Sequence, residues 1–416
     1  MDQMRQVFSV DVLERYAAKG RGVITYIDLS VGRPGEQSIH RVFVDPGGSH
    51  CIATILGSGG AETFYTHAKW SKPRILSKLK GLTLNAVAWN RQQITEASTK
   101  EIILGTDNGQ FHELAVDEKD KREKYIKFLF ELTELPEAIM GLQMETASLS
   151  NGTRYYVMAV TPTRLYSFTG FGSLDTVFAS YLERAVHFME LPGEIPNRQV
   201  LFELHFFIKQ RRAVHFAWLS GAGIYHGGLN FGAQHSSPNG DENFVENKAL
   251  LNYSKLSEGT EAVKPSSMAV SEFHFLLLLG NKVKVVNRIS EQIIEELQFD
   301  QTSESMPKGI IGLCSDATAG IFYAYDQNSI FQVSVNDEGR DMWKAEAAFA
   351  AKDFLRAASF YAKVKPLFHT LLCQCISYYV SFNIPVFLLS LLDFLWDEVD
   401  IVEITLKHVG IWLYMS

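Results

Sequence analysis

Six segments of the chain share one pattern of hydrophobic and polar positions. Each has a short apolar strand, a turn of polar residues or glycine, and a second apolar strand. The segments begin at Cys51, Ile102, Tyr156, Ala213, Phe273 and Ile321. They recur about every 50 residues, which is the spacing of blades in a β-propeller. The pattern therefore predicts a mainly β fold with an N-terminal six- or seven-bladed propeller.

The turns and the surrounding sequence fit this fold. Asp107–Gly109, Gly280-Asn281 and Gln327-Asn328 supply residues that tolerate the positive φ of tight hairpin turns. A pair of β-sandwiches also has short strands, but repetition of one hairpin type favours the propeller. A further apolar run at Gly22–Gly32 could open another blade or close the ring, so the count stays open.

Longer segments separate the hairpins. The mixed charges of Asp117–Lys127 predict a solvated loop or a short helix. The spacing of apolar residues in Leu174–Phe188 predicts a helix packed beside the ring. The polar stretch Gln234–Lys264 is typical of a surface loop around a short strand.

The character of the chain changes after Trp343. Ala345–Lys363 has alanine and aromatic residues at helical spacing, which predicts one helix, or two that meet near Lys352-Asp353. Closely packed small residues of this kind are typical of an α-solenoid. The predicted domains are a propeller over residues 1–340, the start of an α-solenoid over 341–364, and a hydrophobic divergent tail over 365–416.

The tail allows two interpretations. Pro366–Leu392 contains no Asp, Glu, Lys or Arg and is long enough to span a bilayer. The lysines before it and the acids after it would keep the propeller on the cytosolic side. The alternative is a tail that packs on the protein or stays poorly ordered, because Gln374, Asn383 and Pro385 interrupt the apolar run.

Composition and charge argue against several classes of protein. The net charge of −8 and the isoelectric point near 5.9 give no overall attraction to nucleic acid or to anionic lipid. Four cysteines are too few for a disulfide framework, and the acidic first residues do not form a secretory signal. We therefore expect a cytoplasmic propeller.

The sequence predicts no catalytic, cofactor or metal site. It has no GxxxxGK[ST], H-E-x-x-H or G-x-S-x-G motif. Gly57–Gly60 and Gly170–Gly172 are better explained by hairpin turns than by phosphate binding. Cys373 and Cys375 have the wrong spacing for a zinc site. Four histidines near apolar strands or glycine-rich turns are candidate metal or catalytic residues: His205, His215, His226 and His235. We expect no carboxylate beside any of them, so a structural role explains them best.

One charged run is a candidate binding surface. It contains no acid between its first and last lysine, and its cations are Lys69, Lys72, Arg74, Lys78 and Lys80. Such a run could contact anionic lipid head groups or an acidic partner segment. The alternative is a solvated loop between two blades.

Several long segments resemble the deep orange family, the vacuolar protein sorting subunits shared by the HOPS and CORVET tethering complexes. They are Ser271–Glu296, Gly312–Lys344, Ala345–Lys363 and the opening VFSVDVLERYAAKGRGVITYI. The resemblance implies a propeller, a long α-solenoid and a C-terminal RING-type zinc domain. It also implies a scaffold on late endosomes and vacuoles. The implied partners are the other HOPS and CORVET subunits and, indirectly, SNAREs with their Sec1/Munc-type chaperone. It implies no catalytic residue. We also expect no nucleic acid and no small-molecule substrate as partners.

The chain departs from the family pattern in three ways. Lys344 runs directly into Ala345, where the family has intervening helical sequence; the solenoid stops after about one helical unit; and the RING ligands are missing. An alternative transcript or a gene model that reads through an intron would give this sequence. Two other functions remain open: a tail-anchored propeller adaptor outside the tethering complexes, and a propeller enzyme with acids or a nucleophile at the mouth of the ring.

Overall fold

The computed structural model describes most of the predicted propeller and part of the helical segment that follows it. The described residues are 8–15, 37–67, 70, 73–95, 99–117, 122–191, 203–231, 244–256, 263–299, 309–316, 321–325, 329–335, 344–345, 348–349 and 351–364. The chain divides into two compact units. One holds residues 10–286 and 296–333, and the other holds 1–9, 287–295 and 334–416.

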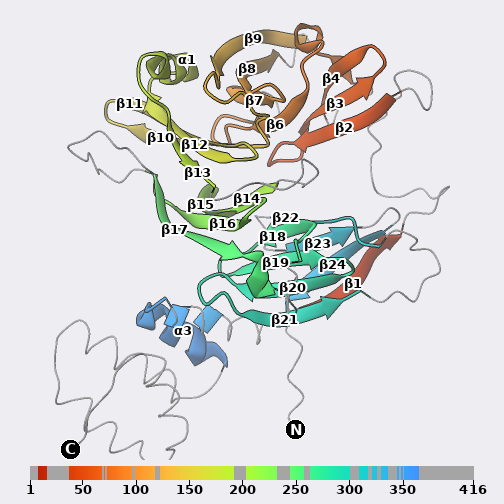
Figure 1. Cartoon of the computed structure of the whole chain (residues 1–416), viewed down its shortest axis with the longest axis vertical. Helices are drawn as coiled ribbons and strands as arrows, with labels where there is room; N and C mark the ends of the chain where they lie inside the picture. Colours follow the sequence, from red (N-terminus) through yellow and green to blue (C-terminus); the bar gives the residue numbers. More distant parts are fainter. Residues whose placement is uncertain are drawn as a thin grey trace, which may run out of the picture. The chain divides into compact units, whose positions relative to one another are not determined.

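The described strands form six four-stranded sheets, drawn in Figure 1. The first three, in chain order, consist of β2 Gln37–Val44, β3 His50–Gly57, β4 Gly60–His67 and β5 Arg74–Ile75; β6 Leu84–Ala88, β7 Ile102–Thr106, β8 Gln110–Asp117 and β9 Arg122–Glu131; and β10 Gly141–Leu149, β11 Gly152–Val160, β12 Arg164–Phe171 and β13 His187–Glu190. Each hairpin predicted from sequence forms the two middle strands of its sheet.

The other three sheets follow the same order. They consist of β14 Glu203–Lys209, β15 Arg212–Leu219, β16 Gly223–Leu229 and β17 Val245–Asn252; β18 Ser267–Val270, β19 His274–Leu279, β20 Lys282–Asn287 and β21 Ile293–Gln298; and β22 Gly312–Asp316, β23 Ile321–Tyr325, β24 Ser329–Val335 and β1 Phe8–Arg15. The sixth sheet therefore takes its outer strand from the beginning of the chain. The run Gly22–Gly32, considered for this role, lies outside the described residues.

The first strand of each sheet lies against the first strand of the next. These contacts join β2 to β6, β6 to β10, β10 to β14, β14 to β18 and β18 to β22. Successive antiparallel sheets joined through their first strands are the blades of a propeller. The prediction of a propeller is confirmed, and the described strands form six blades.

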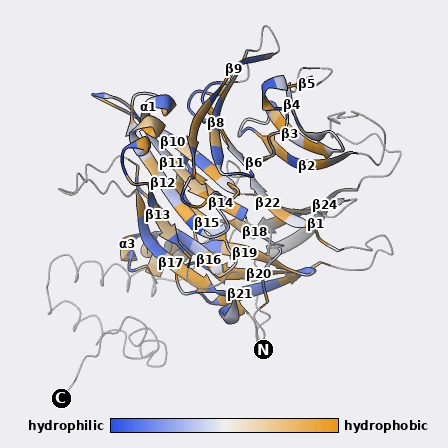
Figure 2. Cartoon of the chain, turned by 45° about the horizontal axis from the view of Figure 1, so that its top comes forward, coloured by the Kyte–Doolittle hydropathy of each residue, from blue (hydrophilic) through white to orange (hydrophobic). Residues whose placement is uncertain are grey.

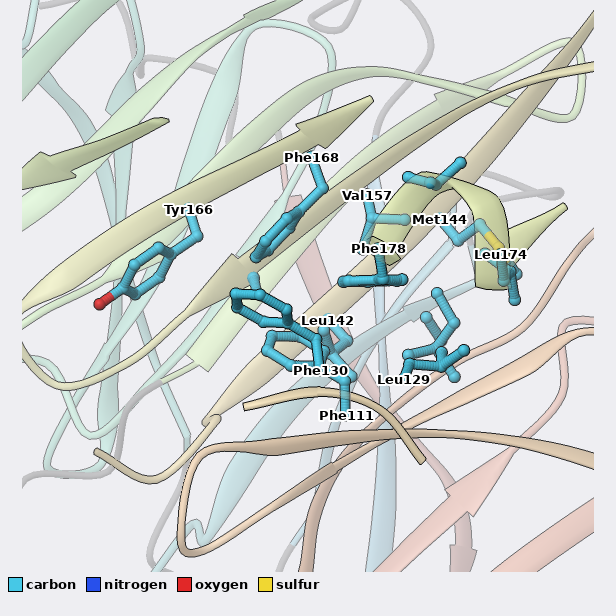
Figure 3. Close-up of a cluster of buried hydrophobic side chains, with 14 of the residues drawn as sticks. Phe111, Leu129, Phe130, Leu142, Met144, Val157, Tyr166, Phe168, Leu174 and Phe178 are labelled. Atoms are coloured by element: carbon cyan, nitrogen blue, oxygen red, sulfur yellow. The ribbon is translucent and has the colours of Figure 1, made fainter. Parts of the chain in front are cut away.

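Large apolar side chains fill the space between neighbouring sheets. Figure 3 shows one such cluster, in which Phe111 of β8, Phe130 of β9 and Phe168 of β12 lie together. Phe111 and Phe168 meet edge to face, with ring centroids 5.5 Å apart. Aromatic pairs in this geometry stabilise a core beyond their buried area. The second sheet carries apolar residues on both faces because it packs against the first sheet and against the third.

Helix α1 Leu174–Ala179 completes the same cluster through Phe178. Its N-terminus is capped by Ser173, whose Oγ accepts a hydrogen bond from the backbone N–H of Thr176 at 3.3 Å. The predicted helix over Leu174–Phe188 was too long. A single 3₁₀ turn, η2 Ser180–Leu182, follows α1, and β13 then begins at His187.

The predicted loop or short helix over Asp117–Lys127 was wrong. Asp117 ends β8, and β9 begins at Arg122 as the outer strand of the second sheet. By contrast, Gln234–Lys264 does contain a short strand, β17, followed by the 3₁₀ helix η3 Tyr253–Leu256.

The predicted tight turns at Gly109 and Gly280 are confirmed. Their φ angles are 81° and 64°, a region that glycine adopts without steric cost. Gln327-Asn328, the third predicted turn, lies outside the described residues.

The helical segment after the propeller contains α3 Phe354–Val364. The expected break near Lys352-Asp353 is present, because Lys352 has a φ of 63° and therefore cannot continue a right-handed helix. Asp353 then caps α3, accepting a hydrogen bond on Oδ1 from the N–H of Arg356 at 3.2 Å. Ala348, Phe354 and Ala357 share a small buried cluster.

The described helices include none that is both long and apolar enough to cross a membrane. The candidate span Pro366–Leu392 lies outside the described residues.

Candidate interaction surfaces

The described part of the predicted basic run lies at the outer edge of the first sheet. Arg74 is in β5, the outer strand, and Lys78 is in the 3₁₀ helix η1 Ser77–Leu79 that leads to the second sheet. Arg74, Lys78 and Lys80 are all exposed. Lys69 and Lys72 lie outside the described residues. Leu76 and Leu79 are buried between the sheets, so η1 is held in place while its cations face solvent.

The second sheet brings further charges to this edge. Ser77 Oγ donates a hydrogen bond to Oε1 of Glu123 in β9 at 3.1 Å, and Lys124 beside it is exposed. This neighbour was not predicted, because the charges of the Asp117–Lys127 segment obscure its strand character. The apolar and aromatic residues of Tyr125–Phe130 were the available indication of a strand.

Buried carboxylates connect neighbouring sheets at the first strands. Glu145 of β10 accepts a hydrogen bond on Oε1 from the N–H of Ala213 in β15 at 3.1 Å, and another from Gln143 Nε2 at 3.0 Å. Burial raises the pKa of Glu145, although these hydrogen bonds and nearby Arg91 and Arg212 favour its charged form. This carboxylate holds the third and fourth sheets together.

Glu203 of β14 has the same role between the fourth and fifth sheets. Its Oε2 accepts hydrogen bonds from the N–H of Met268 at 3.0 Å and from His205 Nε2 at 2.7 Å, and its Oε1 accepts one from Ser267 Oγ at 3.1 Å. Burial alone would raise the pKa of Glu203, but these donors lower it overall. His205 therefore has a carboxylate beside it, and the expectation that it has none was wrong.

Ser267 extends this connection to the sixth sheet. Its Oγ accepts a hydrogen bond from the N–H of Leu313 in β22 at 3.0 Å. Among the described residues no group of three or more His, Cys, Asp or Glu side chains could hold a metal ion. The polar atoms of the first strands thus contact neighbouring sheets.

One face of the first sheet is apolar and partly uncovered. A bulge next to Ile39 puts Ile39, Val42 and Val44 opposite Ile55, Ala53 and Cys51 of β3, so all six side chains lie on the same face. Ile39, Val42 and Val44 are 60%, 48% and 54% exposed. The opposite face, which carries Phe43, Ile52 and Tyr65, packs against the second sheet. Figure 2 colours these strands by hydropathy.

The two described cysteines are poorly suited to nucleophilic chemistry. Burial and the negative charge of Asp45 raise the pKa of Cys51 to about 11, and desolvation by neighbouring groups also raises the pKa of Cys314, although that residue is exposed. The thiolate is the reactive form, so both side chains are mainly unreactive thiols at neutral pH. Cys373 and Cys375 lie outside the described residues.

Comparison with known proteins connects this fold to one family. Residues 4–335 match the family model described as the Pep3/Vps18/deep orange beta-propeller domain. The chain belongs to the Pep3/Vps18/deep orange family. This match covers all six sheets, and it confirms the resemblance drawn from the sequence.

Relatives within this family are named for vacuolar sorting. "Vacuolar sorting protein 18" of Arabidopsis thaliana is 71% identical, over 88% of this chain and 42% of the relative. The zebrafish (Danio rerio) "Vacuolar protein sorting-associated protein 18 homolog" is 26% identical, over 76% of this chain and 32% of its own. "Vacuolar membrane protein pep3" of Schizosaccharomyces pombe is 23% identical, over 76% and 33%. The chain thus spans less than half the length of each relative.

The alignment with the Arabidopsis relative extends over 421 residues, which is more than the 416 residues of the whole chain. The relative therefore carries residues within the aligned region that have no counterpart here. The sequence predicts that such residues are missing between Lys344 and Ala345. The length of the alignment does not test this position.

Proposed function

We propose that this chain is a non-enzymatic scaffold in the docking and fusion of endosomes with the vacuole or lysosome. The observation that carries the proposal is the family match over residues 4–335. The relatives' names refer to vacuolar sorting and, in fission yeast, to the vacuolar membrane. A propeller suits this role because its sheets form a rigid body that presents loops and strand edges to several partners.

The proposed partners are the other subunits of the HOPS and CORVET tethering complexes. Through them the chain would act on SNAREs and their Sec1/Munc-type chaperone. The proposed location is the cytoplasm and the cytosolic surface of late endosomes and vacuoles, as a peripheral protein. The net charge of −8 disfavours nucleic acid as a partner. No small-molecule substrate and no catalysis are proposed, which agrees with the structural use of Glu145 and Glu203 between sheets.

We also propose the domain limits predicted from the sequence. The propeller occupies residues 1–340, the start of an α-solenoid occupies 341–364, and a divergent tail occupies 365–416. The break at Lys352 and the small residues around α3 support a helical unit of the solenoid kind. Contacts that the longer relatives make outside the matched region are not assigned to this chain.

Affinity purification tests the proposed function. The tagged chain is expressed in cells, recovered without crosslinking, and its bound proteins are quantified by mass spectrometry. The proposal predicts enrichment of HOPS or CORVET subunits. The control is Trp218→Asp, which places a charge at a fully buried position of the fourth sheet and should unfold the propeller. Failure of the intact chain to enrich any of these subunits above the control would count against the proposal.

Carbonate extraction distinguishes a peripheral protein from the tail-anchored adaptor. A peripheral scaffold is released from membranes at alkaline pH, whereas an anchored chain remains in the membrane pellet. Retention of the full chain, together with release of a chain that ends at residue 364, would support the anchored adaptor instead.

A further inference from the structure

Four exposed cations from two sheets form one surface, which we call the basic edge: Arg74, Lys78, Lys80 and Lys124. The first three come from β5, from η1 and from the turn that ends η1, and Lys124 comes from β9. The hydrogen bond from Ser77 Oγ to Glu123 Oε1 at 3.1 Å joins the two parts. The basic edge is thus a product of the fold and is wider than the run predicted from the sequence.

One described carboxylate, that of Glu123, lies beside these cations and offsets part of their charge. Glu123 accepts the hydrogen bond from Ser77, and within the described residues no salt bridge joins a carboxylate to Arg74, Lys78, Lys80 or Lys124. Lys127, farther along β9, differs: its Nζ lies 2.8 Å from Asp175 Oδ2. The chain as a whole is acidic, so an excess of cations at one edge would set the orientation in which it approaches a negative surface.

The composition of the edge favours a lipid surface over an acidic peptide. Three of its four cations are lysines, which act as point charges and do not require the fixed two-pronged geometry that arginine offers to single carboxylates or phosphates. Ile75, between Arg74 and Leu76, is 52% exposed. Arg74 and Ile75 lie on opposite faces of the outer strand β5, as their partners Tyr65 and Phe64 do in β4, so an edge-on approach would bring both cations and an exposed apolar side chain to a membrane surface.

We propose that the basic edge binds the anionic cytosolic leaflet, with phosphatidylserine-type head groups as ligands and Ile75 entering the head-group layer. This contact would orient the propeller on the membrane beside its partners. The inference relies on the proposed function only for the location of the chain at an endosomal or vacuolar membrane.

Vesicle flotation tests the contact directly. The purified full chain is mixed with phosphatidylcholine vesicles that contain 0, 10 or 30% phosphatidylserine, at 50 and 300 mM NaCl. Bound protein should rise with phosphatidylserine and fall with salt, because salt screens exposed charges. Binding that is equal at 0 and 30% phosphatidylserine would overturn the proposal.

Reversing charges of the basic edge tests whether this surface makes the contact with the vesicle. Lys78→Glu with Lys80→Glu should weaken binding at least about 20-fold, because each lysine near an anionic membrane is worth about fivefold in affinity. The matched control, Lys100→Glu with Lys248→Glu, changes the net charge equally at exposed positions in other parts of the fold. Equal losses in the two double variants would refute a local site. Circular dichroism melting curves establish that all variants are folded.

Two further arms separate the lipid from a protein ligand and test Ile75. Ile75→Ser should weaken flotation severalfold without changing the response to salt, and an unchanged affinity would remove Ile75 from the proposal. The affinity purification described above is repeated with Lys78→Glu and Lys80→Glu. Retained HOPS or CORVET subunits with lost flotation support the lipid contact, whereas loss of those subunits with unchanged flotation would make the edge a protein interface.

Discussion

Replacing Glu203 by alanine tests the account of how the sheets are held together. Glu203 lies on β14, and its carboxylate contacts the N–H of Met268 and the hydroxyl of Ser267 on β18 as well as His205. The substitution removes every one of these acceptors. Ser267 is 2% exposed, so solvent has little access to its hydroxyl to replace the lost bond.

The expected cost follows from these contacts. A hydrogen bond to a charged group contributes about 1.5–3 kcal/mol, and a buried donor left without an acceptor costs about 1–3 kcal/mol. The two contributions cannot simply be added, because both count the same donors. We therefore expect the substitution to lower the free energy of unfolding by about 3 kcal/mol. Glu203→Gln keeps an oxygen acceptor but no charge, and it should cost about 1 kcal/mol.

The pH dependence of this effect has a defined sign. The pKa of Glu203 is lower in the folded protein than in the unfolded chain. Its stabilising contribution is therefore complete above the unfolded value of about 4.3 and is lost as the pH falls through the lower folded value. The difference between the natural chain and Glu203→Ala should be full at pH 7 and should shrink below about pH 4.

Urea unfolding followed by tryptophan fluorescence measures these differences, because Trp218 is fully buried in β15 beside β14. A loss of about 3 kcal/mol should move the midpoint by about 1 M for a chain of this size. Glu183→Ala, at an exposed position, is the control and should change stability by less than about 0.5 kcal/mol. A midpoint for Glu203→Ala equal to that of Glu183→Ala would refute the proposed connection between the sheets.

Three other predictions test the packing. Gly141→Ala should destabilise the fold by about 1–3 kcal/mol in the same urea assay, because the new Cβ would lie 2.7 Å from Cβ of Leu204 in the next sheet; Gly59→Ala has open space around it, and an equal loss there would contradict this explanation. Cys51 should react with iodoacetamide at pH 8 more than tenfold more slowly in the folded protein than in urea, because its thiol pKa of about 11 keeps it protonated; equal rates would refute the burial of this thiol. Val42→Thr should cost less than about 0.5 kcal/mol and should reduce binding of a hydrophobic dye, since Val42 is 48% exposed; a cost above 2 kcal/mol would show that this face is covered.

The middle strands of every sheet could be predicted from the sequence, because a hairpin is a local structure. Apolar residues and a turn such as that at Gly109 are enough to specify it. The first strands could not be found in this way. β10 contains Gln143 and Glu145, and these polar residues hide its strand character. Glu145 accepts hydrogen bonds from Gln143 and from the N–H of Ala213 in the next sheet, and the local sequence does not indicate the second partner.

The outer strands and the basic edge were harder to predict for a related reason. The charges of β9 suggested a solvated loop, whereas Ile126 packs in the cluster shared with the first sheet and Phe130 in the cluster shared with the third. The lysines of η1 were recognised as a candidate surface, but Lys124 was not, because it joins them only through the contact of two sheets. The pairing of β1 with β24 links opposite ends of the propeller sequence, which no local pattern can indicate.

The central claim is that this chain binds tethering subunits through an intact propeller. The most direct measurement is a pull-down of purified HOPS or CORVET subunits by the purified chain, titrated to saturation, with Trp218→Asp as the unfolded control. We expect saturable binding of at least one subunit by the natural chain and none by the control. Equal recovery with both proteins, or no binding to any subunit, would contradict it.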